Sequence, residues 1–291
     1  MNDSIWYVVL HYQVYKDTIE CVDSVINNSI NSKIVIVDNG SPNQSGYFLK
    51  DYYSGVERVF VIIEKENLGF AKGNNVGFQY AKNNGAEFIV QINNDTIVCD
   101  KNFEKTIVNK YEETCFAVLG PDIVSLVNGM HQNPCKDRNQ NIAEVKQQIR
   151  GNDRLLFCTK YRLLWLKKII SKYHFRSVRK DANDWKEEKE NAFLHGSCWV
   201  FSPIYIEKFN GICDKTFMYV EEDILNYLCK RNGLKMLYSP SLRIFHKEDS
   251  SSNAVLGKTR SKQLFICNHS KNSLNVLLEL MQKGGGYANE K

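Results

Sequence analysis

The first 125 residues alternate short apolar runs with amphipathic segments. Apolar runs of strand length occur at residues 5–10, 33–37, 59–63 and 88–92. Between them, residues 17–26 carry apolar side chains at helical spacing, and residues 74–81 also have the pattern of a helix. Strands that are apolar throughout are buried on both faces, which is typical of parallel sheets. The pattern therefore predicts a parallel α/β sheet over residues 1 to about 125.

The rest of the chain has fewer strands and longer polar stretches. Residues 192–201 read as a strand interrupted at His195-Gly196, and three acids, Glu221 to Asp223, open a helix that ends at Gly233. A last strand is predicted at 234–238, before Pro240, and a last helix at 261–282. We therefore divide the chain into four parts, namely 1–125, 126–190, 191–255 and 256–291, the last being a helix with a frayed tail.

Composition limits the class of protein. The chain has 291 residues, of which 43% are hydrophobic, so it is long enough for a sizeable core. No apolar run approaches membrane-spanning length, and no basic segment precedes the short run at 5–10, so we expect a cytoplasmic protein without a signal peptide. The nine cysteines are scattered without a CxxC pair, which favours reduced thiols in the core over disulfides or a zinc site.

The net charge of +5 is unevenly distributed. Residues 131–190 hold 15 Lys and Arg against 8 Asp and Glu, which predicts an anionic partner for this region and not nucleic-acid binding by the whole protein. Apolar side chains recur there at helical spacing from Leu155 to Ile170, among basic residues that include Arg154 and Lys160. Two interpretations stay open: a basic amphipathic helix at a membrane surface, or a helix packed on the body with its lysines in solvent.

Polar side chains follow three of the predicted strands. Asp38-Asn39-Gly40 follows the second strand, the glycine-rich and asparagine-rich segment 66–77 follows the third, and 91–96 ends the fourth. In open α/β sheets, ligands bind beyond the carboxyl ends of the strands. Asp38 can accept a hydrogen bond from a base or a ribose, although a simple turn explains it too. For 66–77 we favour a ligand loop over a plain helix N-cap at Asn74 or Asn75.

The familiar phosphate-binding motifs are missing. No G-x-G-x-x-G follows the first strand, and the chain has no Walker A sequence. A nucleotide must therefore be held in another way. A nucleotidyltransferase, which also places carboxylates at strand ends, is disfavoured because it would normally need a phosphate-cradling loop near the first strand.

Three segments together resemble the successive motifs of family 2 glycosyltransferases. They are Ile36-Val37-Asp38-Asn39-Gly40-Ser41, the segment from Asn67 to Gly77, and Asn93-Asn94-Asp95-Thr96. The branch is similar to bacterial rhamnosyl- and galactofuranosyltransferases, and the resemblance covers roughly residues 5–250. It implies a GT-A fold, with a mostly parallel sheet flanked by helices. It also implies a nucleotide-sugar donor, Mn²⁺ or Mg²⁺, and inverting transfer to a hydroxyl.

The resemblance also assigns residues. The metal ligands would be Asp95 and His246, with Asn93 standing where the family usually has the first acid of Asp-x-Asp. His195 and Gly196 would line the cleft for the donor sugar and the acceptor, and Trp199 would either stack on a sugar there or, as we favour, belong to the core. The implied nucleotide and donor contacts are Tyr12, Gln13, Asp38, Asn67, Gly69, Gly73, Asn74 and Asn94.

Inverting transfer needs a base that removes the acceptor proton. The family's base is the second acid of a Glu-Asp pair, and an ungapped match from Tyr219 to Gly233 puts it at Glu222, a Glu in place of the usual Asp. Glu221 and Asp223 remain rivals. The dipole at a helix N-terminus explains one or two such acids without any catalytic role.

The sequence thus predicts a glycosyltransferase that uses a UDP- or dTDP-sugar. Its acceptor would be a bacterial surface glycan intermediate, of a capsule or O-antigen, that is lipid-linked at the inner face of the plasma membrane, with peripheral contact through residues 150–180. The alternative is a catalytically silent subunit of similar fold that binds a lipid-linked glycan or a partner enzyme.

Overall fold

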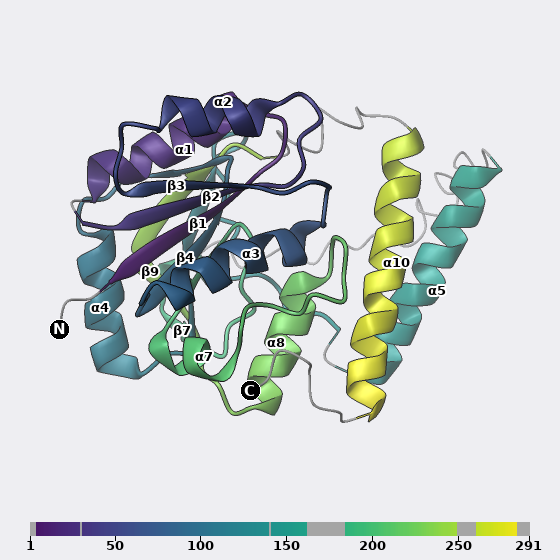
Figure 1. Ribbon diagram of the computed structural model, residues 1–291. Coiled ribbons are helices and arrows are strands. Elements are labelled where there is room, and N and C mark those ends of the chain that lie inside the picture. The colour runs from purple at the N-terminus through teal and green to yellow at the C-terminus, as the bar shows by residue number, and fades with distance from the viewer. Residues whose placement is uncertain (1–3, 30, 140, 162–183, 249–259, 284–291) are drawn as a thin grey trace.

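The computed structural model describes residues 4–29, 31–139, 141–161, 184–248 and 260–283. Within these ranges a nine-stranded sheet forms the centre of the molecule, and helices cover both of its faces. Two long helices, α5 and α10, lie side by side at one end of this body (Figure 1). The α/β fold predicted from the sequence is confirmed.

The strands lie close to the predicted apolar runs. In chain order they are β1 (Ile5–His11), β2 (Lys33–Asp38), β3 (Val59–Ile63), β4 (Phe88–Asn93), β5 (Thr96–Val98), β6 (Val118–Ser125), β7 (Lys189–Glu190), β8 (Cys198–Phe201) and β9 (Met236–His246). The helices are α1 (Tyr15–Asn28), α2 (Ser45–Tyr52), α3 (Phe70–Asn83), α4 (Phe103–Thr114), α5 (Ile142–Lys160), α7 (Pro203–Lys208), α8 (Glu221–Arg231) and α10 (Arg260–Lys283), with a short 3₁₀ turn η1 at Asp184–Lys186.

The sheet has two parts with different pairing. Its order is β3-β2-β1-β4-β8-β6-β9-β5, with β7 paired to β9. The first four strands are parallel, as predicted. The prediction of a parallel sheet is too simple beyond them, because β5 and β6 pair antiparallel with β9 and β8, and only β6 and β9 run parallel. The carboxyl ends of the central parallel strands β1 and β4 therefore lie at the same edge of the sheet.

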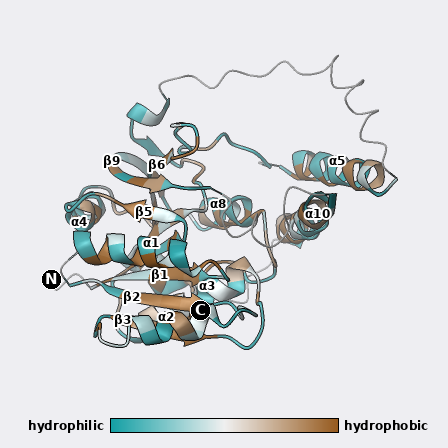
Figure 2. Ribbon diagram, turned by 90° about the horizontal axis from the view of Figure 1, so that it is seen from above, coloured by the Kyte–Doolittle hydropathy of each residue, from teal (hydrophilic) through white to brown (hydrophobic). Residues whose placement is uncertain are grey.

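Each face of the sheet buries its own apolar cluster. One face packs against α1, α2 and α4, and the other against α3, α7 and α8, with parts of α5 and α10. Figure 2 shows the hydrophobic strands enclosed between helices of mixed character. Five of the nine cysteines are buried in these clusters or beside them, in line with their expected role as small core residues.

Two predicted boundaries are wrong. Helix α3 begins at Phe70, so Asn74 and Asn75 lie inside it and neither is its N-cap. Asn75 is buried there because its side chain bonds both the N–H and the C=O of Ile212. Strand β9 does not end before Pro240 but continues to His246. The register against β6 shifts at this point, and such irregularities are where a strand tolerates proline.

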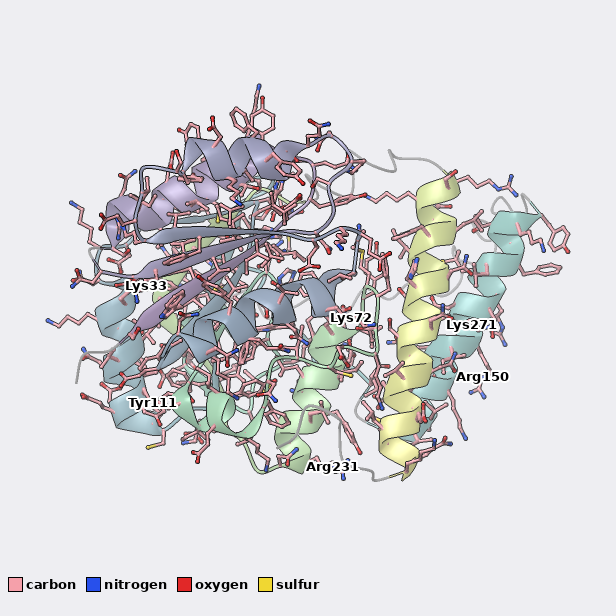
Figure 3. The ribbon with its side chains drawn as sticks, in the orientation of Figure 1. Lys33, Lys72, Tyr111, Arg150, Arg231 and Lys271 are labelled. Carbon is pink, nitrogen blue, oxygen red and sulfur yellow. The ribbon has the colours of Figure 1, made fainter. Side chains whose placement is uncertain are left out.

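Helix α5 lies within residues 126–190 and packs against α10. Asn141 caps α5 by accepting from the N–H of Glu144. Lys271 of α10 pairs with Asp153 of α5 at 2.6 Å, and Figure 3 shows Lys271 and Arg150 on these neighbouring helices. Ser273 ties α10 to the body by donating to the C=O of Met218. The predicted helical spacing over 164–170, the stretch 176–183, the loop 249–252 and the tail from 284 lie outside the described residues.

Among the residues that the structure describes, no helix combines the length and the apolar character needed to cross a bilayer.

Candidate functional site

A pocket of about 450 Å³ lies where β4 ends, next to the first turn of α8 and the α5–α10 pair. Both sequence-predicted regions, the strand-end polar residues and the acid-rich helix start, contribute to it. Its lining includes Phe70, Asn93, Arg138, Asn139, Gln148, Asn152, His195, Gly196, Ser197, Tyr219, Glu222 and Ser270. The lining is mostly polar at the strand ends and along α5, as a site for a hydroxylated ligand requires.

Asp95 and His246 meet beside this pocket although they are far apart in the sequence. Nε2 of His246 lies 3.2 Å from Oδ1 of Asp95. Backbone pairing fixes the two residues, because Thr96 is opposite His246 in the β5–β9 ladder and Lys247 donates its N–H to the C=O of Asp95. The ring of His195, which lines the pocket, lies 5.8 Å from the ring of His246.

A chain of hydrogen bonds sets the tautomer of His246. Nδ1 of His246 lies 2.8 Å from Oε1 of Gln132, and the amide nitrogen of Gln132 donates to Glu248 at 2.9 Å. Because a carboxylate accepts only, Glu248 orients the Gln132 amide so that its oxygen faces the histidine. Nδ1 must then carry a proton, and in the neutral ring the lone pair of Nε2 is directed toward Asp95.

This arrangement fits a divalent cation. Two acceptor atoms 3.2 Å apart repel each other unless a proton or a cation lies between them. Within the described ranges, no group of three or more His, Cys, Asp or Glu side chains is arranged to hold a metal. Asp95 and His246 alone would therefore supply two ligands, which suits Mg²⁺ or Mn²⁺ bound chiefly through substrate phosphates.

The three acids at the start of α8 occupy three different environments. Glu221 is buried and accepts from the Thr216 hydroxyl, and burial, together with the neighbouring Glu222, raises its pKa to about 8. Asp223 is buried against Arg138 and Asn139. Burial raises the pKa of Asp223 to about 6, although Arg138 opposes the rise. All three acids line the pocket, but Glu221 and Asp223 are buried, whereas the side chain of Glu222 is 23% accessible and lies 3.5 Å from Arg138.

The turn that leads into α8 and its three acids has a strained backbone. Tyr219 and Val220 both adopt left-handed backbone conformations, with φ of 71° and 72°. This region is unfavourable for a β-branched valine, so surrounding contacts must hold the turn in place. Both residues line the pocket, and the turn points the N-terminus of α8 at it.

Glycine at position 196 leaves room for Glu222. A Cβ on Gly196 would stand 2.9 Å from Oε1 of Glu222. Next to it, the backbone N–H of His195 donates to Asn133, and the His195 ring contacts Ser197. Burial lowers the pKa of His195, which favours the neutral ring. Asn133 and Ser197 thereby hold the predicted His195-Gly196 segment against Glu222.

The glycine-rich loop is held by hydrogen bonds to Asn39 and by close contact with Phe217. Asn39 donates to Asn67 and to the C=O of Gly69, and accepts from the N–H of Leu68. Gly69 has φ of +85°, and a Cβ there would stand 2.3 Å from the C=O of Phe217. Only glycine fits this position. The loop therefore connects the end of β2 to the segment just before α8.

Asp38 is placed at the end of β2 as predicted but is only 2% exposed. Its carboxylate accepts from the N–H of Ser41 and lies 4.0 Å from the ring of His11. Burial raises the pKa of Asp38 and lowers that of His11 to about 4, so the pair is not held by a full ionic attraction. Asp38 is not part of the pocket lining described above.

The remaining predicted residues separate into two groups. Asn93 lines the pocket, whereas Asn94 is buried and bonds to Thr18. Of the two interpretations of Trp199, the favoured one, a core residue, is confirmed and its place in the sugar cleft is wrong, because its side chain is 0% exposed and packs against Phe201. The other predicted donor contacts are arranged around the loop: Tyr12 is half-buried, the N–H of Gln13 donates to Ser41, Gly73 packs against Leu10, and Asn74 is buried in α3.

Sequence reasoning missed several residues of the site. Arg138 and Asn139 donate hydrogen bonds to Asp223, Gln132 orients His246, and Gln148 and Asn152 of α5 face the pocket. The four-residue spacing of Gln148 and Asn152 on one helix face was a usable signal. The contacts of Gln132, Arg138 and Asn139 depend on tertiary pairing with positions more than eighty residues away.

Comparison with solved structures identifies the fold. The chain superposes on Staphylococcus aureus TarS residues 1–349 with a TM-score of 0.54 at 12% identity, covering 87% of this chain and 63% of that one. It superposes on GalNAc-T7, solved with UDP, GalNAc and Mn²⁺, with a TM-score of 0.57 at 14% identity, covering 85% of this chain and 44% of that one. The GT-A glycosyltransferase fold predicted from the sequence is confirmed.

Sequence comparison gives the relatives. The chain is 29% identical over 121 residues to glycosyltransferase GlyG of Streptococcus pneumoniae serotype 4, covering 41% of this chain and 39% of that protein. It is 28% identical over 144 residues to dTDP-rhamnosyl transferase RfbF of Shigella flexneri, covering 50% of this chain and 47% of that protein. The aligned part thus spans less than half the length of these relatives.

The family model for glycosyl transferase family 2 matches residues 7–201, which include the parallel strands, the glycine-rich loop and Asp95. The site residues beyond that match, Glu222 and His246, are the ones that the fold brings back to the same sheet edge. The chain is a member of glycosyl transferase family 2.

Proposed function

We propose that the protein transfers a sugar from a UDP- or dTDP-sugar to a hydroxyl of a bacterial surface glycan intermediate, with inversion at the anomeric carbon. The observation that carries this proposal is Glu222, whose side chain is 23% accessible while the other two acids of the pocket, Glu221 and Asp223, are buried, in a pocket that Asn93 also lines at the strand end. An inverting transfer needs a base on the face opposite the leaving diphosphate.

Glu222 would act as that base. Its carboxylate lies 3.5 Å from Arg138 and can accept the acceptor proton. Its neighbours are less suited: Glu221 is buried on Thr216, and Asp223 is bound by Arg138 and Asn139. As the acceptor oxygen attacks the anomeric carbon, its proton moves to Glu222, and the bond to the nucleoside diphosphate breaks.

Asp95 and His246 would hold Mn²⁺ or Mg²⁺ at the diphosphate. When bound, such a cation neutralises the negative charge that develops on the leaving group. Gln132 and Glu248 keep the Nε2 lone pair of His246 available for this role. Asn93 has no charge to add, so the diphosphate itself must supply much of the remaining coordination.

The base of the nucleotide would bind near Asp38 and the loop of Asn67 and Gly69. Uracil and thymine present the same Watson–Crick edge, so this site fits UDP and dTDP alike. Because Asp38 is buried beneath Ser41 and against α2, we propose that its contact with the nucleotide requires the 41–44 segment to shift.

The acceptor would lie along α5. Gln148 and Asn152 line the pocket beside Arg138, and Ser270 of α10 faces them. Amide and hydroxyl groups are suited to the hydroxyls of a sugar. At the outer end of α5, the rings of Phe157 and Tyr161 are exposed and 4.7 Å apart, next to exposed Arg154 and Lys160. We propose that this end contacts the anionic inner face of the plasma membrane, where a lipid-linked acceptor would be found.

Release of nucleoside diphosphate tests the transferase proposal. The full chain is incubated with UDP- and dTDP-sugars with and without Mn²⁺, and slow hydrolysis without acceptor is followed by coupled detection of UDP or dTDP. We expect metal-stimulated release from one donor class and loss of release in Glu222→Gln and Asp95→Asn. Equal release by these variants and the wild type would overturn the assigned roles.

A second candidate is a catalytically silent subunit that binds a lipid-linked glycan or a partner enzyme. It is favoured by one observation, the uncharged Asn93 in a site where only Asp95 and His246 are offered to a metal among the described residues. Thermal shift discriminates between the two, since a ligand of the native state raises the melting temperature. A silent subunit would show no shift with UDP, dTDP, GDP, CDP or ADP, with or without Mn²⁺.

A further inference from the structure

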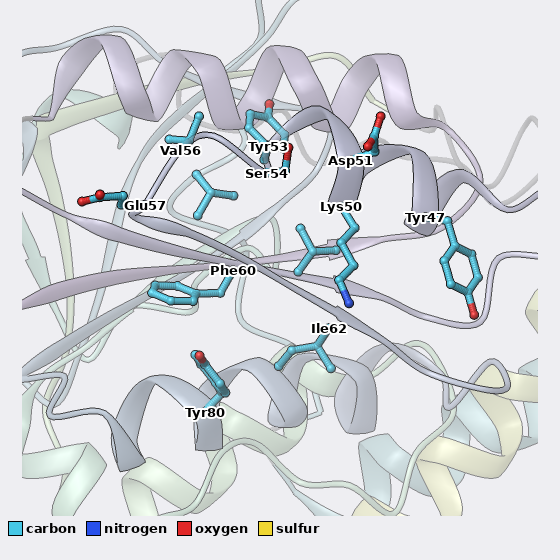
Figure 4. Close-up of a pocket in the computed structure, with 12 residues that line it drawn as sticks. Tyr47, Lys50, Asp51, Tyr53, Ser54, Val56, Glu57, Phe60, Ile62 and Tyr80 are labelled. Carbon is cyan, nitrogen blue, oxygen red and sulfur yellow. The ribbon is translucent and has the colours of Figure 1, made fainter.

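A second hollow, of about 650 Å³, runs along the outer edge of the sheet at β3, on the side of the sheet away from the proposed active site. Figure 4 shows β3 passing between α2 above and α3 below, with Tyr47 and Lys50 on α2 and Tyr80 on α3 flanking it. Nothing in the proposed transfer reaction uses this edge. The outward-facing backbone groups of β3 and the charged residues at its two ends nevertheless have an arrangement that suits a partner strand.

Strand β3 is an edge strand without the usual protection. Its sequence is Val-Phe-Val-Ile-Ile, and four of these five side chains are only partly buried. Proteins normally protect such an edge with lysine, proline or a bulge, because exposed strand backbone pairs with other chains. None of these devices occurs within β3. A partner strand is the simplest cover for it.

The backbone of β3 has free positions in the right places. The C=O of Arg58 accepts from β2, and the N–H of Glu64 donates to β2, so even-numbered residues direct their backbone groups inward. Backbone groups alternate in direction along a strand, so Val61 and Ile63 direct theirs outward, away from β2. The N–H of Val59 already donates to the C=O of Val56, so an added strand would pair with Val61, with Ile63 and with the C=O of Val59.

The charges that flank β3 select the partner. Glu57 and Arg58 precede the strand, and Glu64 and Lys65 follow it. Glu57 and Arg58 lie in the turn before the strand, and Lys65 lies in a bend after it, so these residues flank the strand. If a second copy of β3 pairs antiparallel about a twofold axis at Val61, Glu57 lies near Lys65 of the other copy and Arg58 lies near Glu64. Both pairs of flanking charges are opposite in sign, and the same register places odd residues opposite odd residues. The signs of the flanking charges and the alternating direction of the backbone groups are thus satisfied by the same antiparallel register.

We propose that the protein forms a twofold dimer in which two β3 strands pair antiparallel and the two sheets become continuous. Arg58 also bonds to the C-terminal end of α1, so Glu57 and Lys65, both exposed, form the discriminating pair. Stable interfaces bury roughly 1,600 Å² in total, more than a short strand pair supplies. Tyr47, 64% exposed at the rim of the hollow, extends the contact area. This proposal is independent of the sugar that is transferred.

Charge reversal tests the proposal by sedimentation velocity of the full chain over a concentration series. The wild type is expected to be a dimer, and Glu57→Lys and Lys65→Glu, each alone, are expected to weaken it at least tenfold, because like charges then face each other. The double variant, and an equimolar mixture of the two single variants, are expected to restore dimers, because every cross-strand pair is again opposite in sign. Lys105→Glu, exposed on α4, is the matched control and should leave the dimer intact.

Val61→Pro is the second test. Proline there removes an N–H that points away from β2, so the sheet should stay folded while the partner strand loses a hydrogen bond. Circular dichroism verifies the fold, and the dimer should be lost. A monomeric wild type, or a dimer that persists in Glu57→Lys and in folded Val61→Pro, overturns the proposal. Failure of the mixture to form dimers while each single variant is monomeric overturns the antiparallel register.

Discussion

Nε2 of His246 lies 3.2 Å from Oδ1 of Asp95, and the two residues are held there by adjacent strands. In the neutral ring the lone pair of Nε2 faces this carboxylate, so the two residues can bind a cation together. We predict that Asp95→Asn and His246→Ala each abolish the Mn²⁺-dependent part of UDP or dTDP binding. Isothermal titration with and without Mn²⁺ measures it, and a variant that keeps the full Mn²⁺ enhancement would remove that residue from the metal site.

Gln132 is expected to matter through His246 alone. Gln132→Leu removes the acceptor for Nδ1, so the ring is no longer fixed in one tautomer. Loss of such an outer partner typically costs about 10–100-fold in metal affinity. Mn²⁺ titration of nucleotide binding gives this value. Nucleotide binding without metal should be unchanged, and Glu248→Gln, which keeps a side chain able to accept from Gln132, should have a smaller effect.

Glu222→Gln should remove transfer and leave donor binding intact. General base catalysis contributes about 10²–10⁴-fold, so kcat should fall by this range while the Kd for UDP or dTDP stays the same. Glu221→Gln and Asp223→Asn are the comparison variants. If either of them, with its fold intact, loses as much activity as Glu222→Gln while binding the donor normally, the base has been assigned to the wrong acid.

Gly196→Ala tests the position of the same carboxylate without removing it. The added methyl group would stand 2.9 Å from Oε1 of Glu222, and the flexible end of that side chain would turn away. We expect kcat to fall while the melting temperature stays close to that of the wild type. A large drop in melting temperature would mean that the backbone moves instead, and Gly151→Ala, where a Cβ meets nothing, is the control.

Stability should decrease with rising pH because of Glu221. Its folded pKa is about 8, above the ordinary value of 4.5, so the folded state retains a proton that the unfolded state has released. Between these two pKa values the free energy of unfolding should therefore fall as pH rises, by up to about 1.4 kcal/mol per pH unit. Urea unfolding of the wild type and Glu221→Gln at pH 5.5, 6.5 and 7.5 measures it. The variant should lose this slope, and equal slopes would contradict the prediction.

The sequence was most informative where local pattern decides structure. The four parallel strands follow directly from apolar runs, and polar residues at their ends, such as Asp38 and Asn93, do lie at one edge of the sheet. The sequence was least informative where contacts with residues distant in the chain determine the local structure. Asn75 reads as a cap but is buried by its bonds to Ile212, and Pro240 reads as a strand end but lies where the β6–β9 register shifts.

The environments of the α8 acids also lay beyond sequence reasoning. The family resemblance ranked Glu222 first, but burial on Thr216, pairing with Arg138 and partial exposure, which distinguish the three acids in the structure, depend on tertiary contacts. For Trp199 the sequence favoured the core but left a sugar platform open, and its complete burial decides between them. Spacing in the sequence identifies the candidate site residues, and tertiary packing determines their burial and their hydrogen-bond partners.

The strand order has a consequence for synthesis of the chain on the ribosome. Strands β1 to β4 pair with one another and are complete once residue 93 has emerged. Strands β5 and β6 must wait, because their partners β8 and β9 are made only between residues 198 and 246. During that interval the nascent chain exposes one edge of β4 and two unpaired strands, a condition that favours aggregation. Stop codons before residue 246 would therefore yield products with exposed strand edges, prone to precipitate and to attract chaperones.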